Sequence, residues 1–192
     1  MEPEPKPAQP LMPRQVEGLF GFSWMAEVEV EFLKYLASFK PRILEIGTAS
    51  GVTAACVAQS NPSASLVCVD RFDTYTDDKY DLDRKRNWKR NAEDNMQLVE
   101  CNSSELLKRL PTHLFMFDLI IIDGDHSYEG CYQDLNMVLP YCTKGVTSIV
   151  CHDYSDPNHA GVMKAVHQFL HEHPNTFRFV NIQHSLVELF YQ

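Results

Sequence analysis

Two short segments place acidic and imidazole side chains directly after strongly apolar runs. Asp123 and His126 follow the first run, and His152 and Asp153 follow the second. Asp123, His152 and Asp153 could together bind one divalent cation, which would orient a substrate hydroxyl and lower its pKa. His126 could accept the hydroxyl proton, because imidazole has an ordinary pKa of about 6.5. These residue types predict a site that positions and deprotonates an oxygen nucleophile.

Each of these side chains also has a simpler interpretation. An Asp-Gly pair is usually a turn, which is also the role expected of Asp125, and a single loop histidine is seldom a base. Asp153 could cap the segment that follows it. Because all four groups follow runs that end at one predicted edge, a functional site is the favoured interpretation. Four further histidines are expected to be structural, although the last two could bind a metal: His159, His167, His171 and His173.

A second candidate site is the pattern Glu45-x-Gly47-x-x-x-Gly51. Glycines between a strand and a helix let backbone N–H groups approach a ligand closely. The dinucleotide fingerprint needs further glycines where Ala49 and Val52 stand, so a pyrophosphate would be poorly held. S-adenosylmethionine has no phosphate but carries positive charge, and Glu45 suits the cationic side of such a ligand. The pattern therefore predicts S-adenosylmethionine rather than a nicotinamide dinucleotide.

Asp70 extends this candidate site. It ends the next predicted strand, 19 residues after Gly51, where a carboxylate can bind both hydroxyls of a ribose. Ser103 and Ser104 follow the third strand and could contact an adenine, although Ser103 could equally cap the next helix. The glycine pair alone could reflect a tight helix–strand contact, and Asp70 alone could be a cap. Their combination at strand ends favours a cofactor site.

The elements that must position these residues alternate along the chain. Strands are predicted at 42–46, 66–70, 97–100, 117–122 and 145–151, and an antiparallel hairpin at 177–182 and 186–191. Helices are predicted after a cap at Ser23, at 52–58, 82–93 and 104–110, around 131–139, and at 159–171. The first helix is expected to bury one face, made of Met25, Val28, Phe32, Leu33 and Leu36. Such alternation predicts a doubly wound, mostly parallel α/β sheet with all its loops for ligands on one edge.

Length and composition fit one globular domain. The chain has 192 residues, of which 44% are hydrophobic and 22% are charged, and we predict a proline-rich disordered tail at 1–13 and one domain at 14–192. No apolar run reaches the roughly 20 residues of a membrane span, and the N-terminus lacks the pattern of a signal peptide. Six cysteines without disulfide or zinc spacing favour the cytoplasm. A net charge of −9 disfavours nucleic acid as a partner.

With these residues in view, the chain resembles class I S-adenosylmethionine-dependent methyltransferases. It is most similar to the small metal-assisted O-methyltransferases, including catechol and natural-product sugar O-methyltransferases, and to the related cephalosporin-hydroxylase-like proteins. The segments that carry the resemblance are ILEIGTASGVTA, VCVDRFD, IIIDGDHSYEG and VCHDYSD. It extends from about Gly21 to Tyr191 and implies a Rossmann-like sheet of seven strands.

The resemblance also implies roles for individual residues. His126 matches a catalytic base, and Asp123 and Asp153 match acidic metal ligands. The implied cofactor-binding residues are Glu45, Gly47, Thr48, Ala49, Ser50, Gly51, Asp70, Arg71, Ser103, Ser104 and Asp123. Many relatives have an acid where this chain has His152. Because Mg²⁺ prefers oxygen ligands, His152 indicates Mn²⁺ or a softer ion, a cation held by fewer groups, or no cation.

The expected activity is O-methyl transfer to a hydroxyl of a small molecule, with S-adenosylmethionine and a divalent cation, Mg²⁺ or Mn²⁺, as cofactors. A non-catalytic cofactor-binding protein on the same fold is the alternative. The expected partner is the small substrate, with no nucleic acid and no membrane, and a homodimer is left open. The segment 18–24 could form a lid or an aromatic core contact.

Overall fold

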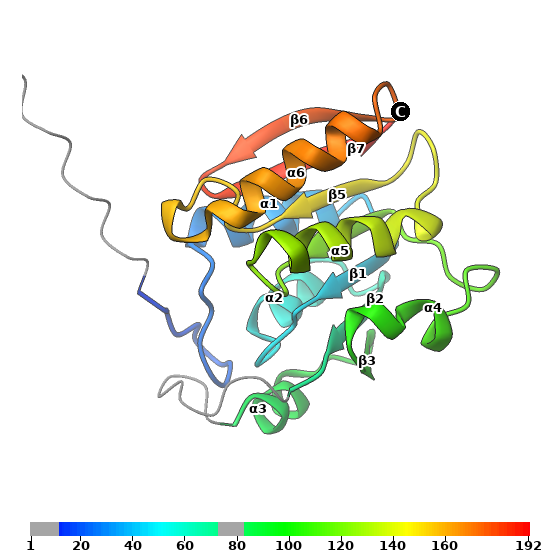
Figure 1. Ribbon diagram of the computed structural model, residues 1–192. Coiled ribbons are helices and arrows are strands. Elements are labelled where there is room, and N and C mark those ends of the chain that lie inside the picture. The colour runs from blue at the N-terminus through cyan, green and yellow to red at the C-terminus, as the bar shows by residue number, and fades with distance from the viewer. Residues whose placement is uncertain (1–11, 73–82) are drawn as a thin grey trace, which may run out of the picture.

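Seven strands form a single sheet in the order β3-β2-β1-β4-β5-β7-β6 (Figure 1). This computed structural model describes residues 12–72 and 83–192. The strands are β1 Arg42–Ile46, β2 Ser65–Asp70, β3 Met96–Glu100, β4 Leu119–Ile122, β5 Ser148–Cys151, β6 Phe177–Gln183 and β7 Leu186–Tyr191. β1 to β5 pair in parallel, whereas β7 is antiparallel to both β5 and β6. The predicted sheet and its C-terminal antiparallel hairpin are confirmed.

Helices cover both faces of the sheet (Figure 1). They are α1 Glu27–Ala37, α2 Val52–Ser60, α3 Arg84–Asn91, α4 Leu106–Arg109, α5 Tyr128–Val138 and α6 Ala160–Glu172. Leu44 and Ile46 of β1 lie in the core beneath α4, α5 and α6, while Ile43 lies in the core beneath α1, α2 and α3. Successive strand residues point to opposite faces, so a continuously apolar strand supplies both cores.

The direction of winding changes between β1 and β4, which are neighbours at the centre of the sheet. Ligands of open α/β sheets bind at such a switch point, beyond the carboxyl ends of the strands. The backbone N–H of Asp123 donates to the carbonyl of Ile46 (2.9 Å), so the loops after β1 and β4 lie side by side. The topology therefore places both predicted sites at one edge of the sheet.

Some element boundaries differ from the predictions. β4 begins at Leu119 rather than Phe117, because the Phe117 N–H donates to Tyr141 in the turn after α5 instead of to the sheet. β5 is also shorter, since it begins at Ser148 rather than at residue 145. Ser23 is not the cap of α1, because the helix begins after Ala26. Of the predicted helix at 82–93, residue 82 lies outside the described residues.

The buried face of α1 differs from the prediction. Leu33 is buried as expected, but Val28 is 44% exposed and Glu29 is fully buried. A carboxylate is costly to bury unless it is hydrogen-bonded, so hydropathy alone would place Glu29 in solvent. The helix is turned so that an acidic side chain enters the protein interior.

The N-terminal segment folds back onto the carboxyl edge of the sheet. Phe20 exchanges backbone hydrogen bonds with the Asn91 side chain (both 2.8 Å), and Asn91 also donates to the carbonyl of Ser50 (2.8 Å). The Arg90 guanidinium lies 3.2 Å from the centre of the Phe20 ring. The segment 18–24 thus packs against α3 and against residues 47–51 between β1 and α2, which are called the glycine loop. Residues 1–11 of the predicted tail lie outside the described residues.

Across the described part of the chain, no helix is both long and apolar enough to span a membrane. All six cysteines are free thiols, and five of them are buried. A cytoplasmic location, a homodimer and the absence of a nucleic-acid partner stay predictions.

Candidate active site

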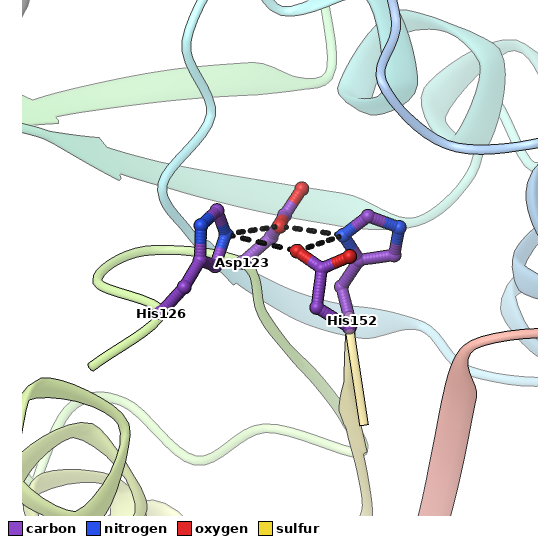
Figure 2. A group of neighbouring side chains, drawn as sticks. Asp123, His126 and His152 are labelled. Atoms are coloured by element: carbon purple, nitrogen blue, oxygen red, sulfur yellow. Dashed lines mark hydrogen bonds and ion pairs between the residues drawn. The ribbon is translucent and has the colours of Figure 1, made fainter. Parts of the chain in front are cut away.

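Four side chains meet beyond the ends of β4 and β5 (Figure 2). The Nδ1 atom of His152 lies 3.0 Å from Oδ1 of Asp123 and 3.1 Å from Oδ2 of Asp153. The Nε2 atom of His126 lies 3.4 Å and 3.2 Å from the same two oxygens. The two imidazoles and two carboxylates therefore alternate around a ring. The four residues that the sequence indicated at two separate strand ends are brought together.

Local backbone structure explains this convergence. The N–H of His152 donates to the carbonyl of Ile122 (3.0 Å), which continues the pairing of β5 with β4 by one residue. Asp153 then adopts a left-handed conformation with φ +60°, which is uncommon for residues other than glycine. Ser127 caps α5 by accepting the N–H of Gly130 (3.0 Å), so His126 comes immediately before the helix. Strained non-glycine residues of this kind cluster at functional sites.

Opposite charges set the protonation of this ring. Although burial raises the pKa of Asp123, the charge of His152 and hydrogen bonds from both imidazoles hold it well below its ordinary value. Burial lowers the pKa of His152, but the carboxylates of Asp123, Asp153 and Glu29 outweigh it and raise that pKa well above its usual range. The pKa of His126 is likewise raised, because Asp123 and Asp153 outweigh its burial. The two carboxylates therefore favour either protonated imidazoles or a cation bound between the four side chains.

The spacing of these four atoms fits a divalent cation. All four lie within 4.8 Å of one another. Ligands bound at about 2.1 Å to one ion, as imidazole nitrogen and carboxylate oxygen are to zinc, lie about 3.0–3.4 Å apart, which is the range of the four distances around the ring. The same distances also suit direct N–H···O contacts when the imidazoles are protonated. The donor set of two nitrogens and two oxygens suits Mn²⁺, Fe²⁺ or Zn²⁺ better than Mg²⁺.

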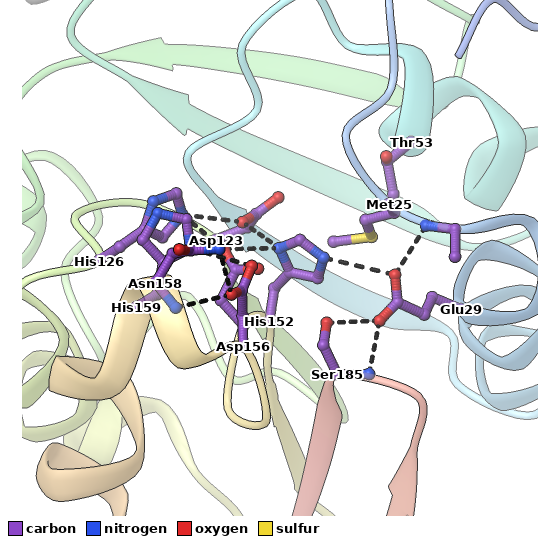
Figure 3. A network of polar contacts seen from close by, with 12 residues as sticks. Met25, Glu29, Thr53, Asp123, His126, His152, Asp156, Asn158, His159 and Ser185 are labelled. Carbon is purple, nitrogen blue, oxygen red and sulfur yellow. Dashed lines mark hydrogen bonds and ion pairs between the residues drawn. The ribbon is translucent and has the colours of Figure 1, made fainter. Parts of the chain in front are cut away.

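A second group of possible ligands adjoins the first. Asp153 is shared with Asp156 and His159, whose Nδ1 atom lies 3.3 Å from Oδ2 of Asp153 (Figure 3). The rings of His126 and His159 are 4.5 Å apart. His159 was expected to be structural, but the structure places it at the rim of the candidate site. The closely spaced Asp153, Asp156 and His159 after one strand could have signalled this.

Glu29 is a further residue that sequence reasoning missed. Its Oε2 atom lies 3.4 Å from Nε2 of His152, on the opposite side of the His152 imidazole from Asp123 (Figure 3). Burial raises the pKa of Glu29, but hydrogen bonds from His152, Ser185 and Ala26 outweigh it and lower the pKa to about 2. A glutamate within the apolar pattern of a helix was the available signal, and only the fold shows what it faces.

Glu45 is a buried carboxyl group at the start of the glycine loop. It is 2% exposed, and its Oε2 atom has no hydrogen-bond partner within the described structure. Burial raises its pKa to about 8, partly offset by a hydrogen bond from Thr48 and reinforced by the charges of Asp123 and Asp70. An unpartnered buried acceptor of this kind calls for a donor or a positive charge from a ligand.

Asp70 fixes the conformation of the glycine loop through a hydrogen bond to its backbone. Its carboxylate accepts the N–H of Ala49 and the N–H of Phe72, each at 2.8 Å. Ala49 has φ +47°, between Gly47 at +86° and Gly51 at +72°, so the Asp70 contact supports a strained turn. Contact between Asp70 and a ribose stays a prediction.

The two glycines of the loop are required by contacts within the protein. A Cβ atom on Gly47 would lie 2.0 Å from the carbonyl oxygen of Asp123, and one on Gly51 would lie 2.6 Å from Cδ1 of Trp88. Trp88 also donates to the hydroxyl of Thr48 (3.2 Å). The neighbours of the two glycines are the loop after β4 and helix α3, not a helix–strand contact, and the approach of a ligand to the glycines stays a prediction.

The remaining predicted cofactor residues lie at the same edge. Ser103 follows β3 and hydrogen-bonds to Asp134 of α5, although burial still raises the pKa of Asp134 to about 6. Ser103 does not cap the next turn, because the Asn102 side chain accepts the N–H of Ser104 (2.9 Å). Arg71 follows β2, and its charge lowers the pKa of Asp134. The adenine contacts stay predictions.

Comparison with known proteins agrees with this arrangement. Residues 44–154 match the family described as a methyltransferase domain. The match begins in β1 and ends just after β5, so it includes the glycine loop, Asp70 and the ring of Asp123, His126, His152 and Asp153. No curated protein matches the chain.

Several solved structures share the fold. The S-adenosylhomocysteine-bound methyltransferase PaMTH1 of Podospora anserina is 19% identical, with 88% of this chain and 80% of that one covered and a TM-score of 0.66. The O-methyltransferase TomG of Streptomyces achromogenes, in complex with S-adenosylmethionine, is 18% identical over 88% and 81% of the two chains, with a TM-score of 0.63.

An O-methyltransferase of Bacillus cereus in complex with S-adenosylhomocysteine is 17% identical, with coverage of 88% and 82% and a TM-score of 0.62. These likenesses confirm the Rossmann-like sheet. The family match covers more than half of the chain and confirms the predicted resemblance and the prediction of a methyltransferase. The chain belongs to the methyltransferase domain family.

Proposed function

We propose that the protein transfers the methyl group of S-adenosylmethionine to a hydroxyl oxygen of a small molecule. The family match and the cofactor-bound structures of similar fold support the methyl donor. The observation that carries the proposal is the ring of two carboxylates and two imidazoles at the switch point of the sheet. In this proposal, one imidazole of the ring would accept a proton beside the position of the substrate oxygen.

The glycine loop and Glu45 would bind the donor. The methionine part of S-adenosylmethionine carries positive charge, and the unpartnered oxygen of Glu45 could accept its contact. A cation beside this carboxyl would lower its pKa toward the ordinary range. Asp70 would accept the ribose hydroxyls, and Ser103 and Ser104 would lie beside the adenine.

The transfer itself requires mainly alignment. The substrate oxygen attacks the methyl carbon as the bond between carbon and sulfur breaks, and the sulfur leaves as the neutral thioether of S-adenosylhomocysteine. The neutral form of His126 would accept the hydroxyl proton at Nε2, the atom that faces Asp123 and Asp153. These carboxylates stabilise the resulting imidazolium, so His126 acts as the general base.

The carboxylates of Asp123 and Asp153 and the Nδ1 atom of His152 would hold a divalent cation. When bound, such a cation lowers the pKa of a coordinated hydroxyl. The spacing of these three ligand atoms fits one ion.

Replacing Asp70 with alanine should weaken S-adenosylmethionine binding by at least about tenfold. The change removes the proposed ribose contact together with the acceptor for the Ala49 and Phe72 N–H groups, and the loss of a hydrogen bond to a charged group costs about 1.5–3 kcal/mol. Isothermal titration of the two proteins measures the effect. A wild type that shows no heat of binding with S-adenosylmethionine would contradict the proposed donor.

Replacing Glu45 with glutamine should stabilise the protein increasingly as the pH rises from about 4.5 to 8. The buried Glu45 carboxyl has a pKa of about 8, so the folded protein keeps a proton that the unfolded chain loses. The contribution of Glu45 to the free energy of unfolding of the wild type is fully present below the pKa that Glu45 has in the unfolded chain. Above that pH, the free energy of unfolding falls by about 1.4 kcal/mol per pH unit until the pKa of Glu45 in the folded protein is reached. Urea unfolding at pH 5 and pH 8 measures the difference between variant and wild type.

The control for this experiment is Glu129→Gln, which changes an exposed glutamate of α5. It should follow the wild type at both pH values. If Glu45→Gln does so as well, Glu45 is ionised in the folded protein and the raised pKa is wrong.

A further inference from the structure

Glu29 is a fully buried carboxylate that the proposed chemistry does not use. It lies on α1, almost 100 residues before the nearest residue of the ring. Its Oε2 atom accepts the N–H of Ala26 (2.7 Å), and its Oε1 atom accepts the N–H and the hydroxyl of Ser185 (2.8 and 2.5 Å). His184 adds a contact to Oε1 at 3.1 Å. The carboxylate is therefore held by two segments of the chain, the start of α1 and the turn before β7.

The remaining contact of Glu29 is with His152. Oε2 of Glu29 lies 3.4 Å from Nε2 of His152, and this buried nitrogen has no hydrogen-bond partner among the described residues. The other nitrogen of the His152 imidazole, Nδ1, faces Asp123 and Asp153 (Figure 3). His152 is thus placed between a fixed acceptor on one side and the ring of ligands on the other.

This placement decides which nitrogen of His152 can bind a cation. A neutral imidazole carries its proton on one nitrogen and a lone pair on the other. An ionised carboxylate can only accept hydrogen bonds, so Glu29 favours the proton on Nε2. The lone pair is then on Nδ1, directed at the site that Asp123 and Asp153 share. Metal-binding histidines commonly donate their second N–H to a carboxylate in this way.

We propose that Glu29 is a positioning residue for the cation site: it binds Nε2–H of His152 and so makes Nδ1 the ligand. The role rests on the cation of the proposed function, and it extends that site to α1 and to the turn between β6 and β7. Because Glu29 faces Nε2 of His152, on the side away from Asp123 and Asp153, its effect on catalysis would be indirect. A purely structural Glu29 would instead tie α1 to Ser185 and affect only stability.

The test compares cation binding by the full chain and by Glu29→Gln. Zn²⁺ is the probe, since it binds imidazole and carboxylate and does not broaden magnetic resonance signals. Isothermal titration should give a 10- to 100-fold higher Kd in the variant, the range found when an outer carboxylate is removed. Long-range ¹H–¹⁵N spectra of His152 should show a proton on Nε2 in the Zn²⁺-loaded wild type and a loss of this preference in the variant.

The matched control is Asp118→Asn. Asp118 is also buried and hydrogen-bonded, but it pairs with Arg42 at the opposite edge of the sheet (2.7 and 3.1 Å). This variant should lose stability and keep the Zn²⁺ affinity of the wild type. Glu29→Asp serves as a milder variant if the glutamine form does not fold. It keeps the charge but withdraws the carboxylate by one methylene group, and its Kd should lie between those of the other two proteins.

The outcomes separate this inference from the proposed function. Wild-type Kd and an unchanged His152 spectrum in the Glu29 variants would overturn the positioning role and leave the cation site intact. Equal weakening in Asp118→Asn would show a general effect of lost stability and would also overturn it. If the His152 signals of the wild-type protein do not respond to Zn²⁺, the cation site and the positioning role are both overturned. The proposed methyl transfer is tested separately, by an assay with labelled S-adenosylmethionine.

Discussion

Replacing His126 with alanine should lower the rate of methyl transfer by about 10²–10⁴-fold, the usual contribution of a general base. Its Nε2 atom lies beside both Asp123 and Asp153, so a proton accepted there is stabilised by two negative charges. The affinity for S-adenosylmethionine should stay unchanged, because the proposed donor site lies at the glycine loop. Transfer of a labelled methyl group to a panel of hydroxylated metabolites measures the rate.

The control is His171→Ala, which removes an exposed histidine near the end of α6 and should have no effect. A protein that binds S-adenosylmethionine but transfers no methyl group to any hydroxylated compound, with or without His126, would favour the non-catalytic alternative. If His126→Ala instead weakens cation binding as strongly as the loss of Asp123 does, His126 is a ligand rather than the base. The spacing of the ring permits this outcome, so cation titration belongs in the same experiment.

Replacing Gly47 with alanine should destabilise the protein by more than about 4 kcal/mol, at the upper end of single substitutions. Gly47 has φ +86°, and an added Cβ atom would lie 2.0 Å from the Asp123 carbonyl oxygen and 2.7 Å from Cα of Gly124. The left-handed conformation alone costs alanine about 1–2 kcal/mol, and the clash with rigid backbone adds the remainder. The loops after β1 and β4 must then separate, which displaces Asp123.

Gly145→Ala is the matched control for this clash. Gly145 has a similar φ of +74°, but nothing lies within 4 Å of the added Cβ atom. Thermal unfolding should show a fall in Tm of more than about 10 °C for Gly47→Ala and of about 5 °C for Gly145→Ala, at about 2–4 °C per kcal/mol for a chain of this size. Equal shifts in the two variants would mean that the loops adapt and that the contact with Asp123 is not tight.

The order of elements could be predicted from the sequence because it depends on local patterns. Residues 66–69 of β2 and 119–122 of β4 are continuously apolar, since each strand supplies a core on both faces of the sheet. Alternation with helices then requires right-handed crossovers, which place the ends of the parallel strands at one edge. The convergence of Asp123 with His152 follows from these rules alone.

Element boundaries could not be predicted in the same way. Phe117 continues the apolar pattern of β4, yet its backbone pairs with the turn after α5. Val28 fits the expected face of α1, yet it is exposed while Glu29 is buried. In both cases the local pattern is compatible with more than one pairing or rotation, and long-range contacts decide between them.

The glycines show a related distinction. Their spacing indicated a turn between a strand and a helix, which the structure contains. The structure adds a reason within the protein, because Gly47 and Gly51 make room for Asp123 and Trp88, while a close ligand stays a prediction. A glycine in a sequence indicates that another group approaches the backbone closely, but only the tertiary structure shows which group that is.

The sequence by itself therefore determined the sheet, its ligand edge and the four residues of the ring. Only the tertiary structure decided what surrounds that ring: Glu29 from α1, Ser185 from the turn before β7, and His159 at the rim. The carboxyl ends of β4 and β5 could be located from hydropathy because each apolar run stops there. Contacts between distant segments depend on how helices rotate and pack, and the local pattern around a single hydrogen-bonded carboxylate such as Glu29 does not show which residues it contacts.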